Sequence, residues 1–450
     1  MTSFGPGMSL PAIEPAWAPA VRADPRLLAD IAHATGGPFH LQDPAHFAHN
    51  ARAFGQALSA AGVQGRVYFG KKANKSACWL PACAETGTGV DVASEAELAH
   101  ALANGVRGED VVVNGAAKSH GLLWLAARQR CLIAVDALDE LELLTSIAHA
   151  TGGARVLLRV LPEVNAKSRF GLSPAELDSA IDHCVAERGS LTTEGFSFHL
   201  NGYEVAPRAQ LAAELVDRCL AARERGLPAE SISIGGGFAV SYVEEADWKE
   251  FNDSYLKSWF HTGKSFTHFY PYHQSPTGAD MLAAILAFPT SGRYANVAEK
   301  FSATGTRLLL EPGRALLDGA GFTVFPVQGF KPRGGYGILT VDGLSMSVSE
   351  QWKGSEYLPD PVLWSPHETG PESSDPVYAC VGGASCMEYD MLTWRKIPFP
   401  RTPRTGDLLI YPNTAGYQMD KNETEFHQLP LPSRVVLSRD ADRFRWKLDR

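Results

Sequence analysis

Short apolar runs alternate with amphipathic stretches from about residue 45 to residue 320. Eight of these runs have the length and the β-branched or aromatic content of strands. They are residues 66–70, 88–94, 110–115, 131–137, 154–160, 195–200, 231–237 and 306–313. Eight strand–helix steps over ~275 residues are typical of a (β/α)8 TIM barrel.

Helix-start signals lie in several of the gaps between these runs. Ser94 and Glu97 form an S-x-x-E capping box ahead of an apolar stretch. Ser173 and Glu176 repeat this logic, with Pro174 at the first helical position. These signals support the alternation of strands and helices.

Beyond residue 320 the pattern changes to short β-rich runs separated by Pro, Gly and Asp. These runs are residues 321–330, 336–343, 360–365, 375–383, 406–412, 433–440 and 443–449. We therefore expect a barrel domain at residues 45–320, followed by an all-β domain of the Greek-key-like barrel type. An aromatic-rich stretch at about residues 241–300 fits neither pattern and is expected to be an insertion in the barrel domain.

The last residues of each predicted strand are the candidates for an active site, because TIM-barrel sites lie at the C-terminal ends of the strands. These ends carry Lys72, Asp91, Asn114, Asp136, Arg159, His199, residues 235–237 and residues 311–314. A purely structural strand end has no need of a lysine, a histidine and a glutamate converging on one mouth.

Two adjacent lysines follow the first barrel strand, and strand parity separates them. Lys71 shares a face with Val67 and Phe69, which suits the outer surface, so its charged end is expected to snorkel into solvent. Lys72 shares the other face with Gly70 and is expected to point into the barrel mouth. An inward lysine in a desolvated site has a depressed pKa and can form a Schiff base. A solvated strand-end lysine is the alternative.

Two further strand ends carry groups suited to a charged ligand, and His199 lies at a third. The glycines at 235–237 offer bare backbone N–H groups for a phosphate. Glu311 can hold a pyridinium N–H, and Arg314 can pair with an anion. Strand–helix turns with a surface ion pair are the alternative, and a packing role is the alternative for His199.

In the β domain, Cys386 follows two glycines and precedes Glu388 and Asp390. A cysteine in such a turn can be a proton donor, although free cysteines are usually buried fillers. Tyr417 lies in another polar turn.

The composition limits the class of protein. The net charge of −9 argues against a nucleic acid or an anionic membrane as the main partner. No apolar run of 18 or more residues predicts a membrane span, and the first twenty residues do not read as a secretory signal. The seven cysteines are scattered, and no cluster predicts a metal site. We expect a cytoplasmic enzyme with reduced thiols.

Eight motifs together resemble one enzyme family. They are KKAN, GVDVASEAEL, SRFGL, FHLNGY, IGGGF, EPGR, GASCMEYDML and GDLLIYPNTAGY. Their order and approximate spacing are similar to those of the fold-type III decarboxylases that depend on pyridoxal 5'-phosphate (PLP). These are the relatives of diaminopimelate, ornithine and arginine decarboxylases, which share the alanine-racemase-like barrel. The resemblance runs from about residue 38 to residue 430.

The resemblance implies roles for the strand-end residues of the barrel. Lys72 matches the lysine that binds the cofactor covalently, and His199 matches the histidine stacked on its ring. Glu311 matches the acid that keeps the ring nitrogen protonated, and Arg314 the EPGR arginine near the phosphate or the substrate carboxylate. The phosphate nest corresponds to Gly235, Gly236 and Gly237, and the remaining positions assigned to the cofactor site are Asp91 and Gly313.

The resemblance also implies that the β domain completes the site. Cys386 matches the cysteine that returns a proton to the substrate, acting in the partner subunit's site, and Tyr417 matches the tyrosine near the phosphate. Met387, Glu388, Arg314 and Tyr417 are the candidate substrate-binding residues. The family is a head-to-tail homodimer with shared active sites. Residues 37–43 match an N-terminal strand that joins the β domain, so that domain comprises residues 1–44 and 321–450.

Departures from the family pattern concern recognition. The usual glycine and serine after the stacking histidine are Asn201 and Gly202, so one hydroxyl contact to the phosphate is missing. Met387 stands where the relatives have an acid directly after the cysteine, and Glu388 lies one position later. The R-P-x-x-Y stretch of diaminopimelate decarboxylases is absent, and residues 347–357 occupy its region.

The connection from residue 237 to residue 311 is longer than usual in the family. Its aromatics, with Lys257, His261 and Lys264, are a candidate cover for a large substrate; a packed surface lobe or a dimer arm is the alternative. An unpaired buried charge is costly, so diaminopimelate and ornithine are not the expected substrates. The ending NTAGY…EFH is similar to that of decarboxylases in siderophore and secondary-metabolite pathways, which take amino acids carrying a bulky attached group.

These features together predict PLP-dependent decarboxylation at the α-carbon of an amino acid or an amino-acid conjugate. An epimerase or racemase on the same scaffold is one alternative, although the AYGHG sequence of alanine racemases is replaced by ANKSACW. A non-catalytic PLP-binding regulator is the other, and the retention of Lys72, Glu311 and Cys386 argues against it.

Overall fold

The computed structural model describes residues 8–348, 354–366, 375–440 and 443–449. The chain divides into two compact units, which we call the barrel unit and the β unit. The barrel unit comprises residues 48–239 and 276–316, and the β unit comprises residues 1–47, 240–275 and 317–450.

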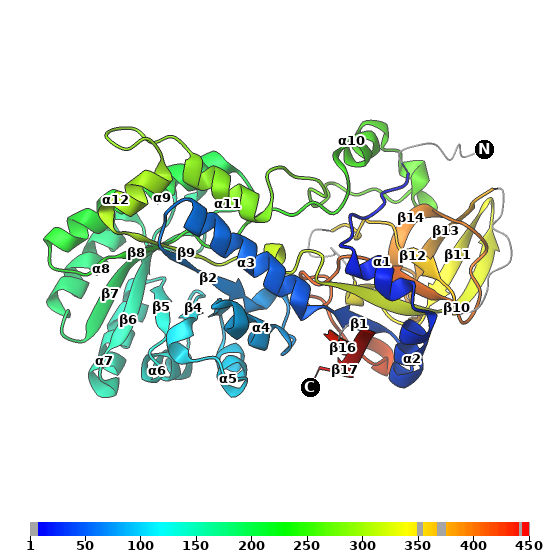
Figure 1. The fold of residues 1–450 in the computed structure, drawn as a ribbon, viewed down its shortest axis with the longest axis horizontal. Helices are drawn as coiled ribbons and strands as arrows, with labels where there is room; N and C mark the ends of the chain where they lie inside the picture. Colours follow the sequence, from blue (N-terminus) through cyan, green and yellow to red (C-terminus); the bar gives the residue numbers. More distant parts are fainter. Residues whose placement is uncertain (1–7, 349–353, 367–374, 441–442, 450) are drawn as a thin grey trace. The chain divides into compact units, whose positions relative to one another are not determined.

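The barrel unit contains a closed barrel of eight parallel strands, as predicted (Figure 1). The strands are β2 (Gly65–Gly70), β3 (Gly89–Val92), β4 (Val111–Val113), β5 (Leu132–Val135), β6 (Ala154–Arg159), β7 (Leu191–Ser197), β8 (Ser231–Ser233) and β9 (Arg307–Leu310). Each coincides with or overlaps a run expected from the sequence.

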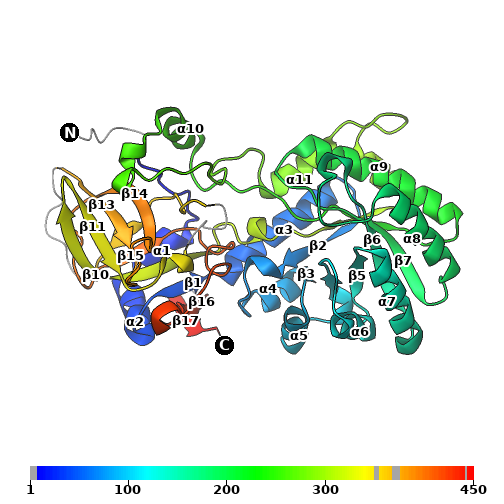
Figure 2. The same ribbon diagram turned by 180° about the vertical axis from the view of Figure 1, so that it is seen from behind.

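Helices connect these strands and form the outer layer seen from behind in Figure 2. They are α3 (Pro44–Ala60), α4 (Trp79–Thr86), α5 (Glu95–Ala103), α6 (His120–Arg128), α7 (Leu138–Thr151), α8 (Pro174–Ala186), α9 (Val205–Glu224), α11 (Gly278–Ala287) and α12 (Val297–Thr304). The predicted caps are present. Ser94 accepts a hydrogen bond from the backbone N–H of Glu97, and Ser173 and Glu176 form a complete capping box.

The interior of the barrel is filled by one apolar cluster. Its members are Tyr68, Val112, Leu132, Leu157 and Leu309, from β2, β4, β5, β6 and β9. Because β2 and β5 are not neighbours in the barrel, their side chains meet only across its interior. Tyr68 therefore points into the barrel, and the neighbouring residues of β2, Val67 and Phe69, point outward.

The β unit is built on one branched, nine-stranded sheet. The longest strand, β10 (Gly321–Arg333), pairs with β1 (Phe39–Gln42), β11 (Tyr336–Val341) and β15 (Leu408–Tyr411). The other strands are β12 (Val362–Trp364), β13 (Val377–Gly382), β14 (Met391–Phe399), β16 (Ser433–Asp440) and β17 (Arg443–Leu448). A separate domain built mainly of β-strands is confirmed, although it also contains helices and although β14 was not expected from the sequence.

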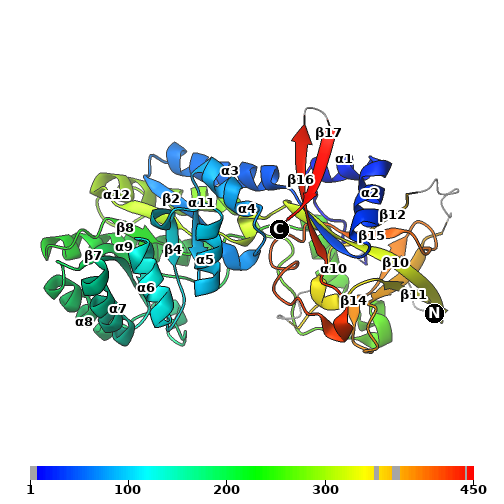
Figure 3. The ribbon, with the colours of Figure 1, turned by 90° about the horizontal axis from the view of Figure 1, so that it is seen from below.

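The N-terminal segment belongs to this sheet. Strand β1 lies between β10 and β16, antiparallel to the first and parallel to the second. Helices α1 (Trp17–Arg22) and α2 (Pro25–Thr35) pack their apolar faces on the same sheet, and Figure 3 shows them near β16 and β17.

The structure divides the aromatic-rich stretch, which was expected to lie wholly in the barrel domain. Residues 240–275, with α10 (Glu245–Ser254), group with the β unit, whereas residues 276–316 return to the barrel unit. Packing explains the division. The ring of Tyr272 lies against that of Tyr357, and its hydroxyl donates to the carbonyl of Glu356 and accepts from the N–H of Leu358.

No helix in the described part of the chain is long and apolar enough to cross a membrane.

We predict that Leu157→Ala destabilises the protein by about 2–5 kcal/mol, because it leaves a cavity in the barrel core. Thermal and urea unfolding followed by far-ultraviolet circular dichroism measure the loss. Leu143→Ala is the matched control, since Leu143 is exposed on α7, and it should change stability by less than about 0.5 kcal/mol. Equal losses in the two variants would contradict the assignment of this cluster to the core.

Candidate active site

A cavity of about 330 Å³ opens at the C-terminal ends of the barrel strands. It brings together five of the strand-end residues singled out from the sequence, which are Lys72, Asn114, Arg159, His199 and Glu311. The rest of its wall consists of Ala93, Gly115, Phe170, Ser197, Phe198 and Asn201. The mouth of the barrel is therefore a polar site.

Lys72 reaches this cavity from the end of β2. Its Nζ lies 2.6 Å from Oδ2 of Asp91 on the neighbouring strand β3, and its side chain is 49% exposed. Gly70 lies beneath the amine, since a Cβ there would lie 3.4 Å from the Lys72 Nζ, in van der Waals contact. The inward direction expected for Lys72 agrees with this geometry.

The expectation for Lys71 was wrong. Its side chain does not snorkel, because the residue is 1% exposed and its Nζ donates a hydrogen bond to the carbonyl of Lys75. Strand β2 ends at Gly70, and the chain then turns into a 3-10 helix over Lys71–Ala73. Strand alternation therefore stops one residue before Lys71.

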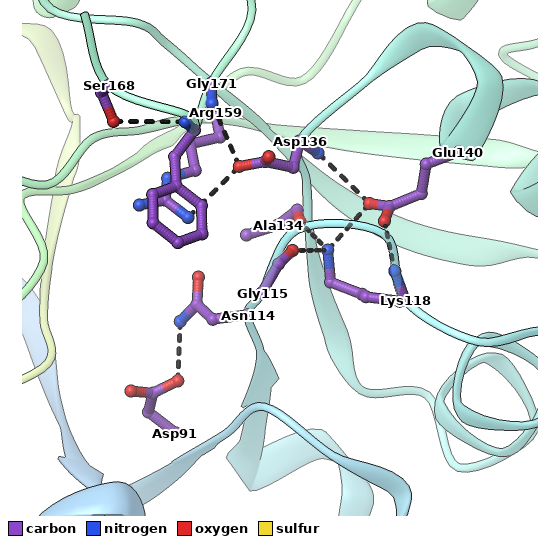
Figure 4. Close-up of polar contacts among 11 residues, drawn as sticks. Asp91, Asn114, Gly115, Lys118, Ala134, Asp136, Glu140, Arg159, Ser168 and Gly171 are labelled. Carbon is purple, nitrogen blue, oxygen red and sulfur yellow. Dashed lines mark hydrogen bonds and ion pairs between the residues drawn. The ribbon is translucent and has the colours of Figure 1, made fainter.

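Two carboxyl groups flank the Lys72 amine. The Asn114 amide donates to Oδ1 of Asp91 at 2.7 Å, which Figure 4 shows, and the Ser233 hydroxyl donates to Glu311 at 2.6 Å. Burial raises the pKa of Glu311, and the negative charge of Asp91 raises it further. Glu311 is thus a carboxyl group that gains from a cationic or N–H partner.

His199 is held as a neutral ring. Its Nδ1 faces the backbone N–H of Gly236 at 3.3 Å, and since that N–H can only donate, Nδ1 is the acceptor and the ring proton sits on Nε2. Burial lowers the pKa of His199 to about 3, helped by the positive charges of Lys72, Arg208 and Arg159. This histidine is suited to packing against a ring rather than to acid–base chemistry near neutral pH.

The glycine loop 235–237 is packed tightly against its surroundings. A Cβ on Gly235 would lie 2.7 Å from the His199 Nδ1, and a Cβ on Gly236 would lie 2.7 Å from the Glu311 carbonyl. On Gly237 it would lie 2.6 Å from Nη2 of Arg208. Arg208 is a buried residue of α9 that no sequence motif indicated.

A polar network holds the strand ends on the far side of the cavity (Figure 4). Arg159 lies over the Phe170 ring at 4.4 Å and 3.2 Å from the Asp136 carboxylate, which also accepts from the N–H of Gly171. Burial raises the pKa of Asp136.

Behind this group, the Lys118 amine is buried against Glu140 at 2.8 Å and donates to the carbonyls of Gly115 and Ala134. Burial lowers the pKa of Lys118. The network fixes Arg159 as a cation in the cavity wall.

Gly313 and Arg314 are buried in the turn after β9, where Arg314–Leu316 forms a 3-10 helix, and neither lines the cavity. The remaining predicted site residues belong to the β unit. They are Cys386, Met387, Glu388 and Tyr417. Cys386, Met387 and Glu388 are exposed, and Tyr417 is half-buried with φ +75°. Five residues of the stretch 347–357, namely 349–353, lie outside the described residues.

A thiol–imidazole pair that the sequence did not indicate is found in the β unit. The Cys386 Sγ lies 3.1 Å from Nε2 of His427, which is 41 positions away. A cavity of about 520 Å³ in the same unit is lined by residues next to each of them in the chain. Its wall comprises Leu344, Ser345, Met346, Met387, Asp390, Asn422, Glu423, Thr424 and Phe426.

The aromatic residues of 240–275 pack mainly against one another. Tyr242, Tyr270 and Tyr272 form mutual edge contacts and are buried. Among the three basic residues, His261 hydrogen-bonds to the hydroxyl of Tyr336 and Lys264 lies over the Trp394 ring, whereas Lys257 is exposed. These contacts favour the packed-lobe interpretation for most of the stretch.

We predict that His199→Gln reduces the loss of stability on acidification. The unfolded chain protonates this histidine near pH ~6.5, whereas the folded protein does so only at about 3. The unfolded state therefore binds more protons between these values, and His199 lowers stability as the pH falls through this window, by up to ~1.4 kcal/mol per pH unit. Thermal unfolding of the cofactor-free protein between pH 8 and pH 5 measures the difference. Parallel curves for the two chains would show that His199 titrates normally.

The barrel-forming half of the chain matches a known family model. Residues 45–269 match the pyridoxal binding domain of pyridoxal-dependent decarboxylases. An uncharacterized protein of Sinorhizobium fredii is 37% identical over 422 residues, which cover 92% of this chain and 91% of that protein. Diaminopimelate decarboxylase of Bacillus subtilis is 26% identical over 430 residues, covering 90% and 88%.

Solved structures share the fold. Diaminopimelate decarboxylase from M. jannaschii superposes with a TM-score of 0.73 at 19% identity, covering 94% of this chain and 91% of that one. Lysine/ornithine decarboxylase from Vibrio vulnificus, complexed with putrescine, gives 0.70 at 19% identity, covering 95% and 99%.

The residues at the barrel mouth fit a phosphorylated pyridine aldehyde. They include an accessible lysine, a buried carboxyl group that gains from an N–H partner and a tight glycine loop beside an arginine. The matched family and its members use pyridoxal phosphate. The chain belongs to the pyridoxal-dependent decarboxylases that include diaminopimelate, ornithine and arginine decarboxylases.

Proposed function

We propose that this protein removes the carboxyl group from the α-carbon of an amino acid or amino-acid conjugate, with its cofactor anchored on Lys72. The observation that carries the proposal is the position of the Lys72 amine, 2.6 Å from Asp91 in a cavity that Glu311 and His199 also line. Family membership supports the reaction type.

The barrel residues divide the task of holding the cofactor. Lys72 would bind the aldehyde carbon, residues 235–237 the phosphate, and Glu311 the ring nitrogen, with the neutral His199 ring against the pyridine face. Pyridoxal phosphate, when bound, supplies the electron sink that allows the bond to the leaving carboxylate to break. The raised pKa of Glu311 suits it to share a proton with the ring nitrogen.

Asp91 keeps Lys72 ready for this role. Its buried carboxylate holds the amine by an ion pair, and the Asn114 amide orients that carboxylate from its other oxygen. The pair directs the amine into the cavity, where Lys72 can accept or release a proton beside the reacting carbon.

We assign the return of a proton to the substrate carbon to Cys386. Of the seven cysteines, Cys386 alone is exposed, while Cys78 is half-buried and the others are buried. His427 lies within hydrogen-bond reach of its sulfur and can restore the proton from solvent. Since Cys386 lies in the β unit, we propose a homodimer in which the active sites are shared between subunits. Seven free cysteines suit a reducing cytoplasm.

We further propose that the substrate side chain carries no distal charge. In the 520 Å³ cavity of the β unit, Leu344, Met346, Met387 and Phe426 supply apolar wall. Its two carboxylates are already engaged: Asp390 accepts from the N–H groups of Ser345 and Ser385, and Glu423 pairs with Arg434.

A distal ammonium group would therefore gain little here, which disfavours diaminopimelate and ornithine. An amino acid with a bulky, uncharged attached group, of the kind found in siderophore or other secondary metabolism, suits this cavity better.

Substitution of two adjacent lysines tests whether Lys72 is the residue that binds the cofactor. We expect Lys72→Ala to lose the visible absorption of the lysine-bound cofactor, because Lys72 supplies the only amine found beside Asp91 in the described residues. Lys71→Ala is the matched control and should keep the band, since the Lys71 amine is turned to the Lys75 carbonyl. Spectra after incubation with pyridoxal phosphate and gel filtration show the difference. A band that persists in Lys72→Ala would refute the assignment.

The reaction is tested with a panel of amino acids and conjugates in deuterium oxide. We expect release of CO2 and an amine with one deuterium at the former α-carbon. Uncharged bulky substrates should turn over at least about tenfold better than diaminopimelate or ornithine, because each unpaired buried charge costs one or more kcal/mol. A retained carboxyl group with an exchanged or inverted α-carbon would indicate an epimerase instead. Absence of any turnover by the cofactor-loaded protein would favour a regulator.

A further inference from the structure

Arg208 is a fully buried arginine without a counter-ion in the described part of the chain. It lies on α9, in the barrel unit, and is 0% exposed. Its Nη2 donates to the carbonyls of Gly202 and Gly237, at 3.2 and 3.4 Å. Its Nε and Nη1 have no hydrogen-bond partner among the described residues, and no described carboxylate forms a salt bridge with it.

The side chain is nevertheless a cation under ordinary conditions. Burial lowers the pKa of Arg208 to about 10, which leaves it charged at neutral pH. A buried, unpaired charge is among the costliest features of a protein interior. Two other cations near the cavity, the half-buried Arg159 and the buried Lys118, each lie beside a carboxylate. Arg208 differs from both, because no carboxylate of the described residues pairs with it, and its charge would be stabilised by a bound anion.

The position of Arg208 indicates that such an anion would bind at the glycine loop. Nη2 lies 2.6 Å from the place where a Cβ of Gly237 would be, so the guanidinium lies directly against the glycine loop. Its positive charge is one of the causes that lower the pKa of His199. The positive charge of Arg208 therefore acts on His199, a residue that lines the cavity.

The two hydrogen bonds from Arg208 also orient the backbone. In a trans peptide the N–H points opposite to the C=O. Because the carbonyls of Gly202 and Gly237 point at the guanidinium, the N–H groups of the following residues, Tyr203 and Phe238, point away from it. The resemblance to the family also implies that Gly202 stands where a serine contacts the phosphate. Arg208 thus binds the backbone of the residue that replaces that serine.

We propose that Arg208 is the counter-charge for the phosphate of the bound cofactor and that it compensates for the missing serine hydroxyl. This inference rests on the proposed function, since it requires a phosphorylated cofactor at the glycine loop. Arg208 is a positioning residue: its nitrogen atoms are buried behind the loop, and it acts through the oriented peptides and through its charge.

A purely structural role is the competing explanation. An arginine that only ties the segment after β7 to the glycine loop would affect stability and every ligand of the cavity alike. A counter-charge for phosphate affects only ligands that carry the phosphate. Comparison of pyridoxal phosphate with pyridoxal, which lacks that group, separates the two.

The experiment measures Kd for both ligands by visible absorbance in the wild-type protein and in Arg208→Gln. We expect the wild type to prefer the phosphorylated ligand strongly, and the ratio of the two Kd values to fall by about tenfold or more in Arg208→Gln. Arg208→Lys, which keeps the charge, should retain most of the preference. An unchanged ratio in Arg208→Gln would overturn the proposal, even if both affinities fell.

Arg223→Gln is the matched control. Arg223 lies on the same helix and donates to the carbonyls of Ala229 and Thr304, which is a structural role away from the cavity. Its loss should lower stability and leave the Kd ratio unchanged. A fall in the ratio equal to that of Arg208→Gln would show that general loosening of the barrel, not the Arg208 charge, is responsible.

A second measurement covers the case in which Arg208→Gln does not fold. The phosphorus resonance of pyridoxal phosphate bound to the wild type should stay that of the dianion below pH ~6, where a free phosphate monoester takes up a proton. A bound phosphate that titrates like the free one would overturn the proposal. If neither ligand binds the wild type, the proposed function fails first, and this inference fails with it.

Discussion

The pairing of β2 with β9 closes the barrel, and the candidate site depends on this closure. The register places Val67 opposite Leu310, and the N–H of Gly70 donates to the carbonyl of Pro312 at 3.1 Å, which carries the contact up to the mouth. On the other side of β2, Gly70 lies opposite Asp91 of β3. Lys72 therefore emerges between strands that end in two carboxylic acids, although Glu311 is far away in the sequence. Without this closure Glu311 would not face the amine, whereas Asp91 is placed by the direct pairing of β2 with β3.

Charge balance at the mouth explains the states of the individual groups. Lys72 and Arg159 each have a carboxylate partner, whereas Arg208 has none among the described residues. The surplus of positive charge, added to burial, keeps His199 neutral. The buried Glu311 is driven toward its protonated form by burial and by Asp91. Bound pyridoxal phosphate would stabilise both groups. Its dianionic phosphate would balance the positive charge of Arg208, and its protonated ring nitrogen would donate an N–H to Glu311.

The sequence predicted the parts of this arrangement that follow from local periodicity. The eight barrel strands follow from short apolar runs that are visible in the residues themselves. The expected direction of Lys72 agrees with the structure, although Lys72 lies in the 3-10 turn beyond the end of β2. The prediction failed at Lys71, because alternation holds only while the chain is a strand and the 3-10 turn begins at that residue. It also missed β14, whose run of Met391–Phe399 carries Arg395 and Lys396 in buried positions that look exposed in the sequence. His427 and Arg208 could not be found in this way, since their partners lie 41 and 29 positions away and no periodic pattern connects them.

One physical rule, the cost of an unpaired buried charge, applies at both the glycine loop and the cavity of the β unit. At the glycine loop, the buried guanidinium of Arg208 donates to the Gly202 carbonyl and has no carboxylate partner among the described residues. In the β unit, Met387 lines a cavity whose two carboxylates, Asp390 and Glu423, already have partners. A ligand without negative charge at the glycine loop would leave Arg208 uncompensated. A charged group in the cavity of the β unit would meet the same penalty, because the carboxylates there are already engaged. The same rule therefore favours an anion at the glycine loop and disfavours a charged group in the cavity of the β unit.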